Sequence, residues 1–145
     1  MIPGTSPRPA CRSAVYRRLR LAALASLLAA FLAASTDAQV SSDDAAKRIG
    51  LSIANSPLVK TAIAGGDANW GRVIMAVGKS GEPTDMTRLG VAFGGHEVAR
   101  AGAAVPDLDE APVAAHLAGL EVKMDVVVGA GPGTATVWTC DLSHD

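Results

Sequence analysis

A short polar loop at residues 67–72 holds the side chains best suited to bind a ligand. Asp67, Asn69 and Arg72 lie within six residues of one another, so they offer a carboxylate, an amide and a guanidinium together. Such groups can bind a small polar substrate when rigid elements fix both ends of the loop. The alternative is that Asp67 and Asn69 hydrogen-bond their own turn while Trp70 fills the core. The sequence leaves both interpretations open.

Two lysines flank this loop and can attract a substrate carboxylate. Lys60 precedes the loop and Lys79 follows it. A lysine ammonium is a strongly hydrated point charge, so a solvated position on the surface is the commoner outcome for each. The candidate substrate-binding residues are Lys60, Asp67, Asn69 and Arg72.

A glycine pattern and a set of cysteine and histidine residues suggest a nucleotide site and a metal site, but neither lies in the sequence context that such a site needs. Gly129, Gly131 and Gly133 have the spacing of a nucleotide-binding turn, which must lead from a strand into a helix. Residues 134–138 favour a strand, so we expect a plain hairpin loop instead. Cys140 and the histidines have no spacing typical of a closed zinc site. We therefore predict no metal site and no bound cofactor.

Helix caps and apolar patterns predict the elements that hold the polar loop. Residues 41–44 resemble a capping box, which predicts a helix over about 43–54. Pro57 begins a second helix, and Gly65 ends it in a left-handed conformation. Residues 73–77 are a continuous apolar run, which favours a strand covered on both faces. The loop would thus connect a helix end to a buried strand.

The second half of the chain predicts strands separated by glycine turns, and one helix. The alternating or β-rich stretches are residues 89–93, 96–99, 122–126 and 134–142. Gly94 and Gly95 indicate a tight hairpin between the first two, and residues 129–133 indicate another before the last. A helix capped by Asp109 ends at Gly119. This order favours an α+β fold over a doubly wound sheet.

Three stretches of the chain resemble a single enzyme family. They read SPLVKTAIAGGDANWGRVIMAVGKSGEP, DLDEAPVAA and ATVWTCDLS, at residues 56–83, 107–115 and 135–143. They are similar to the C-terminal part of the bifunctional ornithine/glutamate N-acetyltransferases of arginine biosynthesis, over about residues 40–145. The resemblance implies a fragment of a layered helix/sheet/sheet/helix fold.

This resemblance implies a segment of an acetyltransferase without its catalytic residues. Enzymes of the family cleave themselves before a threonine, whose new N-terminus carries the acetyl group from N-acetylornithine, or from acetyl-CoA, to glutamate. The family's nucleophilic threonine, oxyanion-hole residues and substrate-binding lysine belong to segments upstream of Val40, so none carries over to this chain. We expect a truncated glutamate N-acetyltransferase that is inactive alone, with acetyl-CoA as a possible substrate. The implied partners are the missing N-terminal α chain and the rest of the β chain.

The first 39 residues have a different character from the rest. Five arginines, the last at Arg20, precede an apolar run at 21–34, and cleavage after Ala38 would complete a secretory signal peptide. The run is too short for a stable membrane span. A non-native head and a core helix are the alternatives. The family resemblance implies the cytoplasm, whereas a real signal would make the protein a secreted or periplasmic one, such as a small exported binding or structural domain.

The composition and charge of the chain exclude one class of binding partner. The net charge is −1 with 49% hydrophobic residues, which is typical of a chain that can bury a core. The arginines of the head leave residues 40–145 acidic, and no basic cluster is present there. Nucleic acid is therefore not an expected partner.

Overall fold

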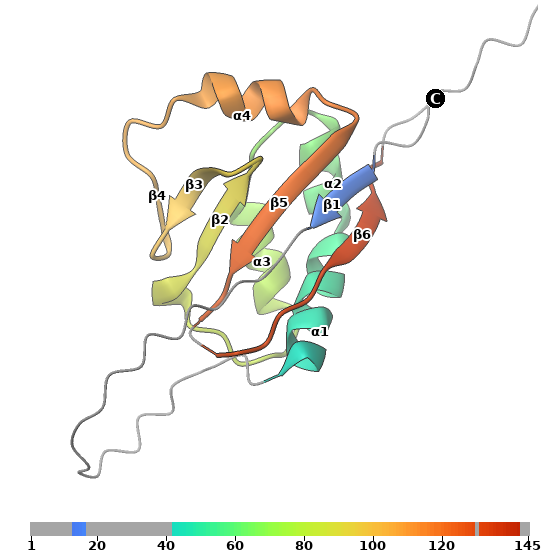
Figure 1. Ribbon diagram of the computed structural model, residues 1–145, viewed down its shortest axis with the longest axis vertical. Helices are drawn as coiled ribbons and strands as arrows, with labels where there is room; N and C mark the ends of the chain where they lie inside the picture. Colours follow the sequence, from blue (N-terminus) through green and yellow to red (C-terminus); the bar gives the residue numbers. More distant parts are fainter. Residues whose placement is uncertain (1–12, 17–41, 130, 143–145) are drawn as a thin grey trace, which may run out of the picture.

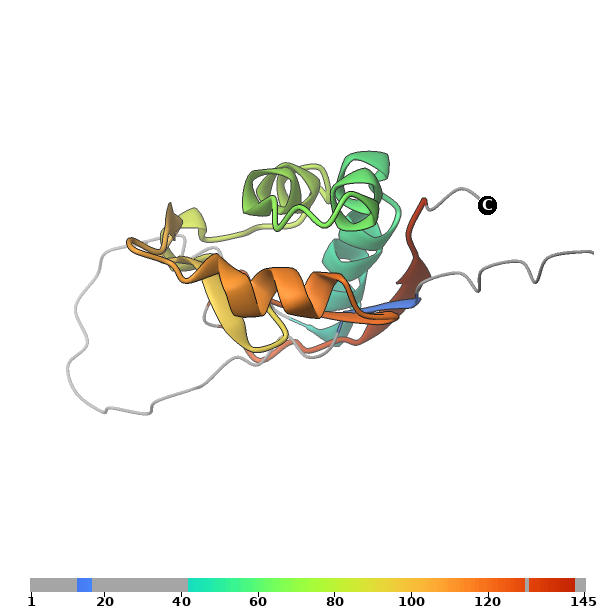
Figure 2. The same ribbon diagram turned by 90° about the horizontal axis from the view of Figure 1, so that it is seen from above.

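The computed structural model describes residues 13–16, 42–129 and 131–142 of the 145-residue chain. Helices α1, α2 and α3 form a layer over one face of a six-stranded sheet, and α4 lies across one end of the strands (Figures 1 and 2). The predicted α+β class is therefore confirmed. Within the described ranges, no helix is long and apolar enough to cross a membrane.

Helices α1 (Asp43–Ala54) and α2 (Pro57–Ala64) begin and end where the sequence predicts. Ser42 caps α1, because its hydroxyl oxygen accepts a hydrogen bond from the Ala45 N–H at 3.2 Å. Ser56 caps α2 in the same way, directly before the proline of its first turn. The left-handed residue after α2 is Gly66, with φ of 70°, one position later than predicted.

Residues 73–77 are helical, so the prediction of a buried strand was wrong. They belong to α3 (Trp70–Gly78). Val73, Ala76 and Val77 are buried, whereas Met75 is 55% exposed. This is the i, i+3, i+4 pattern of a helix with one face on the core. A continuous apolar run is compatible with either structure, and here packing against α1 and α2 decides in favour of the helix.

The sheet has the strand order β4-β3-β2-β5-β1-β6. The strands are β1 (Ser13–Tyr16), β2 (Gly90–Phe93), β3 (His96–Arg100), β4 (Ala103–Ala104), β5 (Glu121–Val127) and β6 (Val137–Cys140). All neighbouring pairs are antiparallel except β1 with β5. The predicted hairpin between β2 and β3 is confirmed, with positive φ at Gly94 and Gly95. A 3-10 turn (Met86–Arg88) precedes β2, and α4 (Glu110–Leu117) precedes β5.

The loop at residues 129–133 does not form a hairpin turn, which corrects the second predicted hairpin. Strands β5 and β6 on either side of it are not neighbours, because β1 lies between them (Figure 1). The last strand is also shorter than predicted. β1 comes from the head that the sequence sets apart from the rest of the chain, whereas the apolar run of the proposed signal peptide lies outside the described residues. The division near residue 39 stays a prediction.

The core lies between the sheet and the helix layer. The helix-facing side chains of β2 and β5 are Val91, Phe93, Val122, Met124 and Val126, and all are buried. They pack with Ile49, Ile53, Val73 and Val77 of the helices. No described helix covers the opposite face of the sheet (Figure 2). On that face Lys123 and Asp125 form an ion pair at 3.1 Å, and Trp138 is 66% exposed.

Candidate functional site

The polar loop between α2 and α3 is organised by its own hydrogen bonds. Asn69 caps α3, because its Oδ1 accepts a hydrogen bond from the Arg72 N–H at 3.1 Å. The Nδ2 of Asn69 donates to Asp67 Oδ2, also at 3.1 Å. The structure thus brings Asp67 and Asn69 together in the arrangement expected of a self-bonded turn. The same bonds hold the exposed carboxylate of Asp67 in a fixed place.

The two cationic candidates take separate positions. Arg72 reaches back to α2, where its Nη1 donates to the Leu58 carbonyl oxygen at 3.0 Å. This bond ties the start of α3 to the start of α2 and leaves the other guanidinium N–H groups for other acceptors. Lys60 is half-buried on α2. The structure therefore joins the side chains of Asp67 and Asn69, whereas only the backbone N–H of Arg72 bonds to Asn69, and Lys60 takes no part in these hydrogen bonds. Their role in substrate binding stays a prediction.

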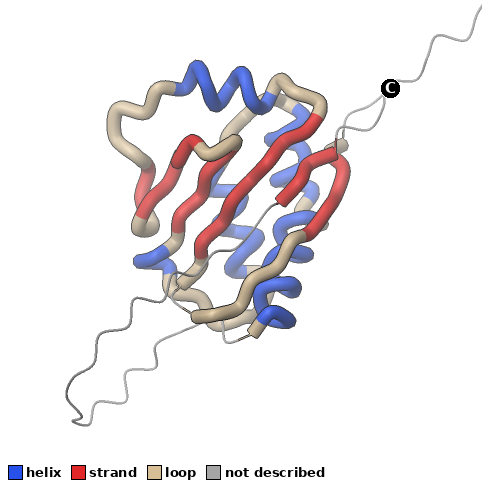
Figure 3. The backbone as a smooth tube through the Cα atoms, in the orientation of Figure 1, coloured by secondary structure: helices blue, strands red, loops and turns tan. Residues whose placement is uncertain are grey.

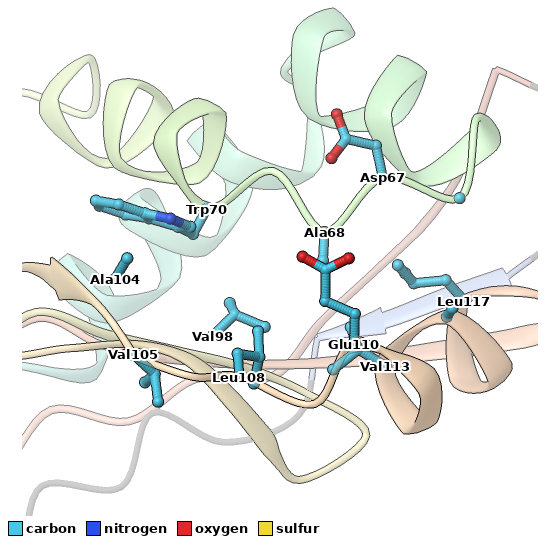
Figure 4. A pocket seen from close by; sticks show the side chains of 12 residues that line it. Asp67, Ala68, Trp70, Val98, Ala104, Val105, Leu108, Glu110, Val113 and Leu117 are labelled. Carbon is cyan, nitrogen blue, oxygen red and sulfur yellow. The ribbon is translucent and has the colours of Figure 1, made fainter.

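A pocket of about 410 Å³ opens beside this loop. Trp70 and Asp67 line it from the loop side, and Val98, Leu108 and Val113 line it from the sheet and α4 (Figure 4). The indole of Trp70 lies across from Ala104 at one end, and Leu117 lies at the other (Figure 4). Most of the wall is therefore apolar. Trp70 is half-buried and packs against the core, as the alternative for this loop expected.

The charged groups of the pocket are carboxylates. Glu110 extends its carboxylate toward Ala68, while Asp67 lies above it on the loop (Figure 4). The lining residues include no lysine, arginine, histidine, serine, threonine or cysteine. Such a pocket suits an apolar side chain or a cationic group, and its lining offers no hydroxyl, thiol or amine nucleophile. Sequence reasoning did not select Glu110; its place after the helix cap Asp109 was the available signal.

A second, shallower hollow lies where α1, α2 and α3 meet. Its lining includes Arg48, Asn55 and Lys79, so its charges are basic. Arg48 is paired with Glu82, and the hydrogen bond from the guanidinium lowers the pKa of the Glu82 carboxyl despite partial desolvation. Lys79 caps the end of α3, where a cation is favoured by the helix dipole.

Two other polar groups have structural partners. Asp85 Oδ1 accepts hydrogen bonds from the hydroxyl and the N–H of Thr87, at 2.6 and 3.0 Å, and the hydroxyl bond lowers the pKa of Asp85. His116 accepts a hydrogen bond at Nε2 from the Lys123 N–H at 2.8 Å, so this histidine of α4 has a structural partner. In the described part of the chain, no three His, Cys, Asp or Glu side chains gather as a metal site.

Comparison with known proteins agrees with the resemblance read from the sequence. The model of the ArgJ family matches residues 32–145. The chain belongs to the ArgJ family. The match begins a few residues before the expected boundary at residue 40. The similarity to the ArgJ family therefore extends over most of the chain.

The relatives of this ArgJ-family chain are longer proteins. The arginine biosynthesis bifunctional protein ArgJ of Zymomonas mobilis is 59% identical over 114 residues, which are 79% of this chain and 28% of the relative. That of Gluconobacter oxydans is 64% identical over 99 residues, which are 68% of this chain and 23% of the relative. The chain thus spans about a quarter of the length of these relatives.

A solved structure shares the fold. The crystal structure of the arginine biosynthesis bifunctional protein ArgJ from Bacillus halodurans superposes with a TM-score of 0.68 at 36% identity. The superposition covers 72% of this chain and 49% of the other. The expected relation to the family fold is therefore confirmed over the shared part.

Proposed function

We propose that this chain is the C-terminal segment of a glutamate N-acetyltransferase and that it is inactive alone. The observation that carries the proposal is the ArgJ-family match over residues 32–145, with 59% identity to a relative of which the chain covers 28%. The reaction transfers acetyl from N-acetylornithine, or from acetyl-CoA, to glutamate, and it takes place in the cytoplasm. Identity this high supports the same fold and the same place in the longer enzyme.

The chemistry of the described residues supports the proposed inactivity. Acyl transfer through a covalent intermediate needs a nucleophile next to a base, and donors that stabilise the oxyanion. The pocket beside the polar loop has carboxylates that could act as bases, but its lining includes no hydroxyl, thiol or amine side chain to serve as the nucleophile. Asp67, Asn69 and Arg72 can contribute hydrogen bonds and charge to a substrate, and the one amine among the candidates, Lys60, does not line the pocket.

The uncovered sheet face supports a partner that completes the enzyme. Trp138 is 66% exposed there, on the same face as the half-buried pair Lys123 and Asp125. Tryptophan is enriched in surfaces that bind protein, and here it lies on a sheet face that no described helix covers. We assign this face to the remainder of the longer family chain. The outer surface of the helix layer, which includes Met75, faces solvent in that assembly.

Co-expression with the rest of a relative tests the proposal. Acetyl transfer from N-acetylornithine to glutamate is measured for this chain alone, for the unmatched part of the Zymomonas mobilis protein alone, and for both together. We expect activity only for the pair. Trp138→Lys on the sheet face should abolish it, and Met75→Lys on the helix surface should not. Transfer by this chain alone, or none from a complex that forms, would overturn the proposal.

A further inference from the structure

One strand of the sheet comes from outside the family match. β1 lies at residues 13–16, whereas the match begins at residue 32. Both of its neighbours, β5 and β6, lie inside the match. A strand that the family relationship does not include therefore lies between two strands that it does (Figure 3).

Strands β5 and β6 need a third strand between them. Neighbouring strands lie about 4.8 Å apart, so removing β1 would leave a gap of about twice that spacing. The backbone N–H and C=O groups on the facing edges of β5 and β6 would then lose their partners. Family chains that share the matched segment, which contains β5 and β6, face the same requirement. Their third strand has to come from the unmatched three quarters of their chains.

We propose that the position of β1 is an acceptor slot for an extended strand. A strand from the unmatched part of the longer family chain binds there in place of β1. It runs parallel to β5 and antiparallel to β6, as β1 does. The inference rests on family membership and strand order, and it is independent of the acetyl-transfer chemistry.

The side chains around the slot define the strand that fits. On the helix side the slot is flanked by Val122 and Met124 of β5 and by Val137 of β6, all buried. On the uncovered face it is flanked by Lys123 and by the exposed Trp138. Because side chains alternate along a strand, the incoming segment needs apolar residues at every second position, and it can carry polar ones between them.

The first test uses the full chain with Val15→Pro, and Val15→Thr is the matched control. Proline removes a backbone donor from β1, whereas threonine keeps it and favours a strand. We expect amide hydrogens of β5 and β6 to exchange about tenfold faster or more in V15P, while those of α1 are little changed. V15T should behave like the unsubstituted chain.

The second step adds synthetic peptides that tile the unmatched part of the Zymomonas mobilis relative. One contiguous stretch should bind V15P about tenfold more tightly than it binds the unsubstituted chain, because β1 no longer competes. The same peptide should restore slow exchange in β5 and β6. No binding peptide, or equal binding to both chains, would refute the slot.

A chain that can be cut by a protease tests the proposal without V15P, in case that variant does not fold. A protease site introduced within residues 21–34 is cut after folding, so that β1 is held only by the sheet. Excess of the binding peptide should then release the head fragment, which mass spectrometry detects. Retention of the fragment at every peptide concentration would show that β1 is a fixed part of this chain and not an exchangeable occupant.

Discussion

Replacing Gly50 by alanine tests the close approach of α1 to the sheet. Alanine in a helix interior is normally about 1 kcal/mol more favourable than glycine. At Gly50, however, the added Cβ would lie 2.7 Å from Val137 Cγ2 of β6. Ordinary carbon contacts lie at about 3.5–4.0 Å, so the valine or the helix has to move. Valine is stiff about χ1, which makes that movement costly.

The expected magnitude follows from these two opposing effects. Overpacking a core costs about 1–3 kcal/mol, and the helix preference returns about 1 kcal/mol. Gly50→Ala should therefore lower the free energy of unfolding by about 1 kcal/mol. In a Val137→Ala background the Cγ2 is gone, and the nearest remaining atom is the Cβ of residue 137, at 3.6 Å. There the same substitution should raise stability by up to about 1 kcal/mol.

Urea unfolding followed by far-ultraviolet circular dichroism measures all four members of this cycle. Gly78→Ala is the matched control, because it adds a Cβ at the last residue of α3 with no atom within 4 Å. It should be neutral or stabilising. If Gly50→Ala stabilises as Gly78→Ala does, or has the same effect with and without Val137, then α1 does not pack on β6 as described.

Three further predictions concern single side chains. Asn69→Ala removes the cap of α3 and should cost about 1 kcal/mol in urea unfolding, whereas Asn69→Ser should cost a few tenths; equal losses would argue against capping. Gly94→Ala places a Cβ at positive φ, 2.6 Å from His116 Cγ. At Gly81 φ is also positive but the space is open, so Gly94→Ala should destabilise by about 1–2 kcal/mol more than Gly81→Ala. Equal urea midpoints for the two variants would contradict the contact with His116. The hydrogen bonds to Asp85 lower its folded-state pKa, so the stability they provide is present above the unfolded-state pKa and is lost as the pH falls through the folded-state pKa. Asp85→Asn should therefore flatten the decline in urea midpoint between about pH 5 and pH 2. An unchanged decline would show that these hydrogen bonds are not linked to stability.

The local elements could be predicted where a cap and a pattern agree. For α1, hydroxyl and acidic residues at the start and apolar residues at i, i+4 indicate the same boundaries. Residues 73–77 carry no such agreement, since β-branched residues favour a strand and a fully apolar run has no readable period. The capping ability of Asn69 is the signal that separates the alternatives, but an asparagine in a polar loop is equally compatible with ligand binding or with a self-bonded turn.

The strand order could not be predicted because it depends on distant pairing. The glycines at 129–133 satisfy the local rules for a hairpin, and local rules cannot reveal that another strand lies between the two they connect. The pocket could not be predicted for the same reason, since its lining comes from segments distant in sequence. Asp67 and Trp70 could be selected from one polar loop, but Val98 and Glu110 join them only through the packing of β3 and α4.

The pairing of β1 has a consequence for how the chain folds during synthesis. Residue 13 pairs with residue 121 and with residue 140, so this strand closes the longest loops in the sheet. Contacts so distant in sequence slow folding, because the entropy of loop closure is lost before the contacts form. On a ribosome, β1 emerges before β5 and β6, and it can pair with both only after the residues up to 140 have been made. Synthesis of β6 thus sets the time at which the sheet can close, and until then the sheet edges are open to aggregation or to capture by another chain.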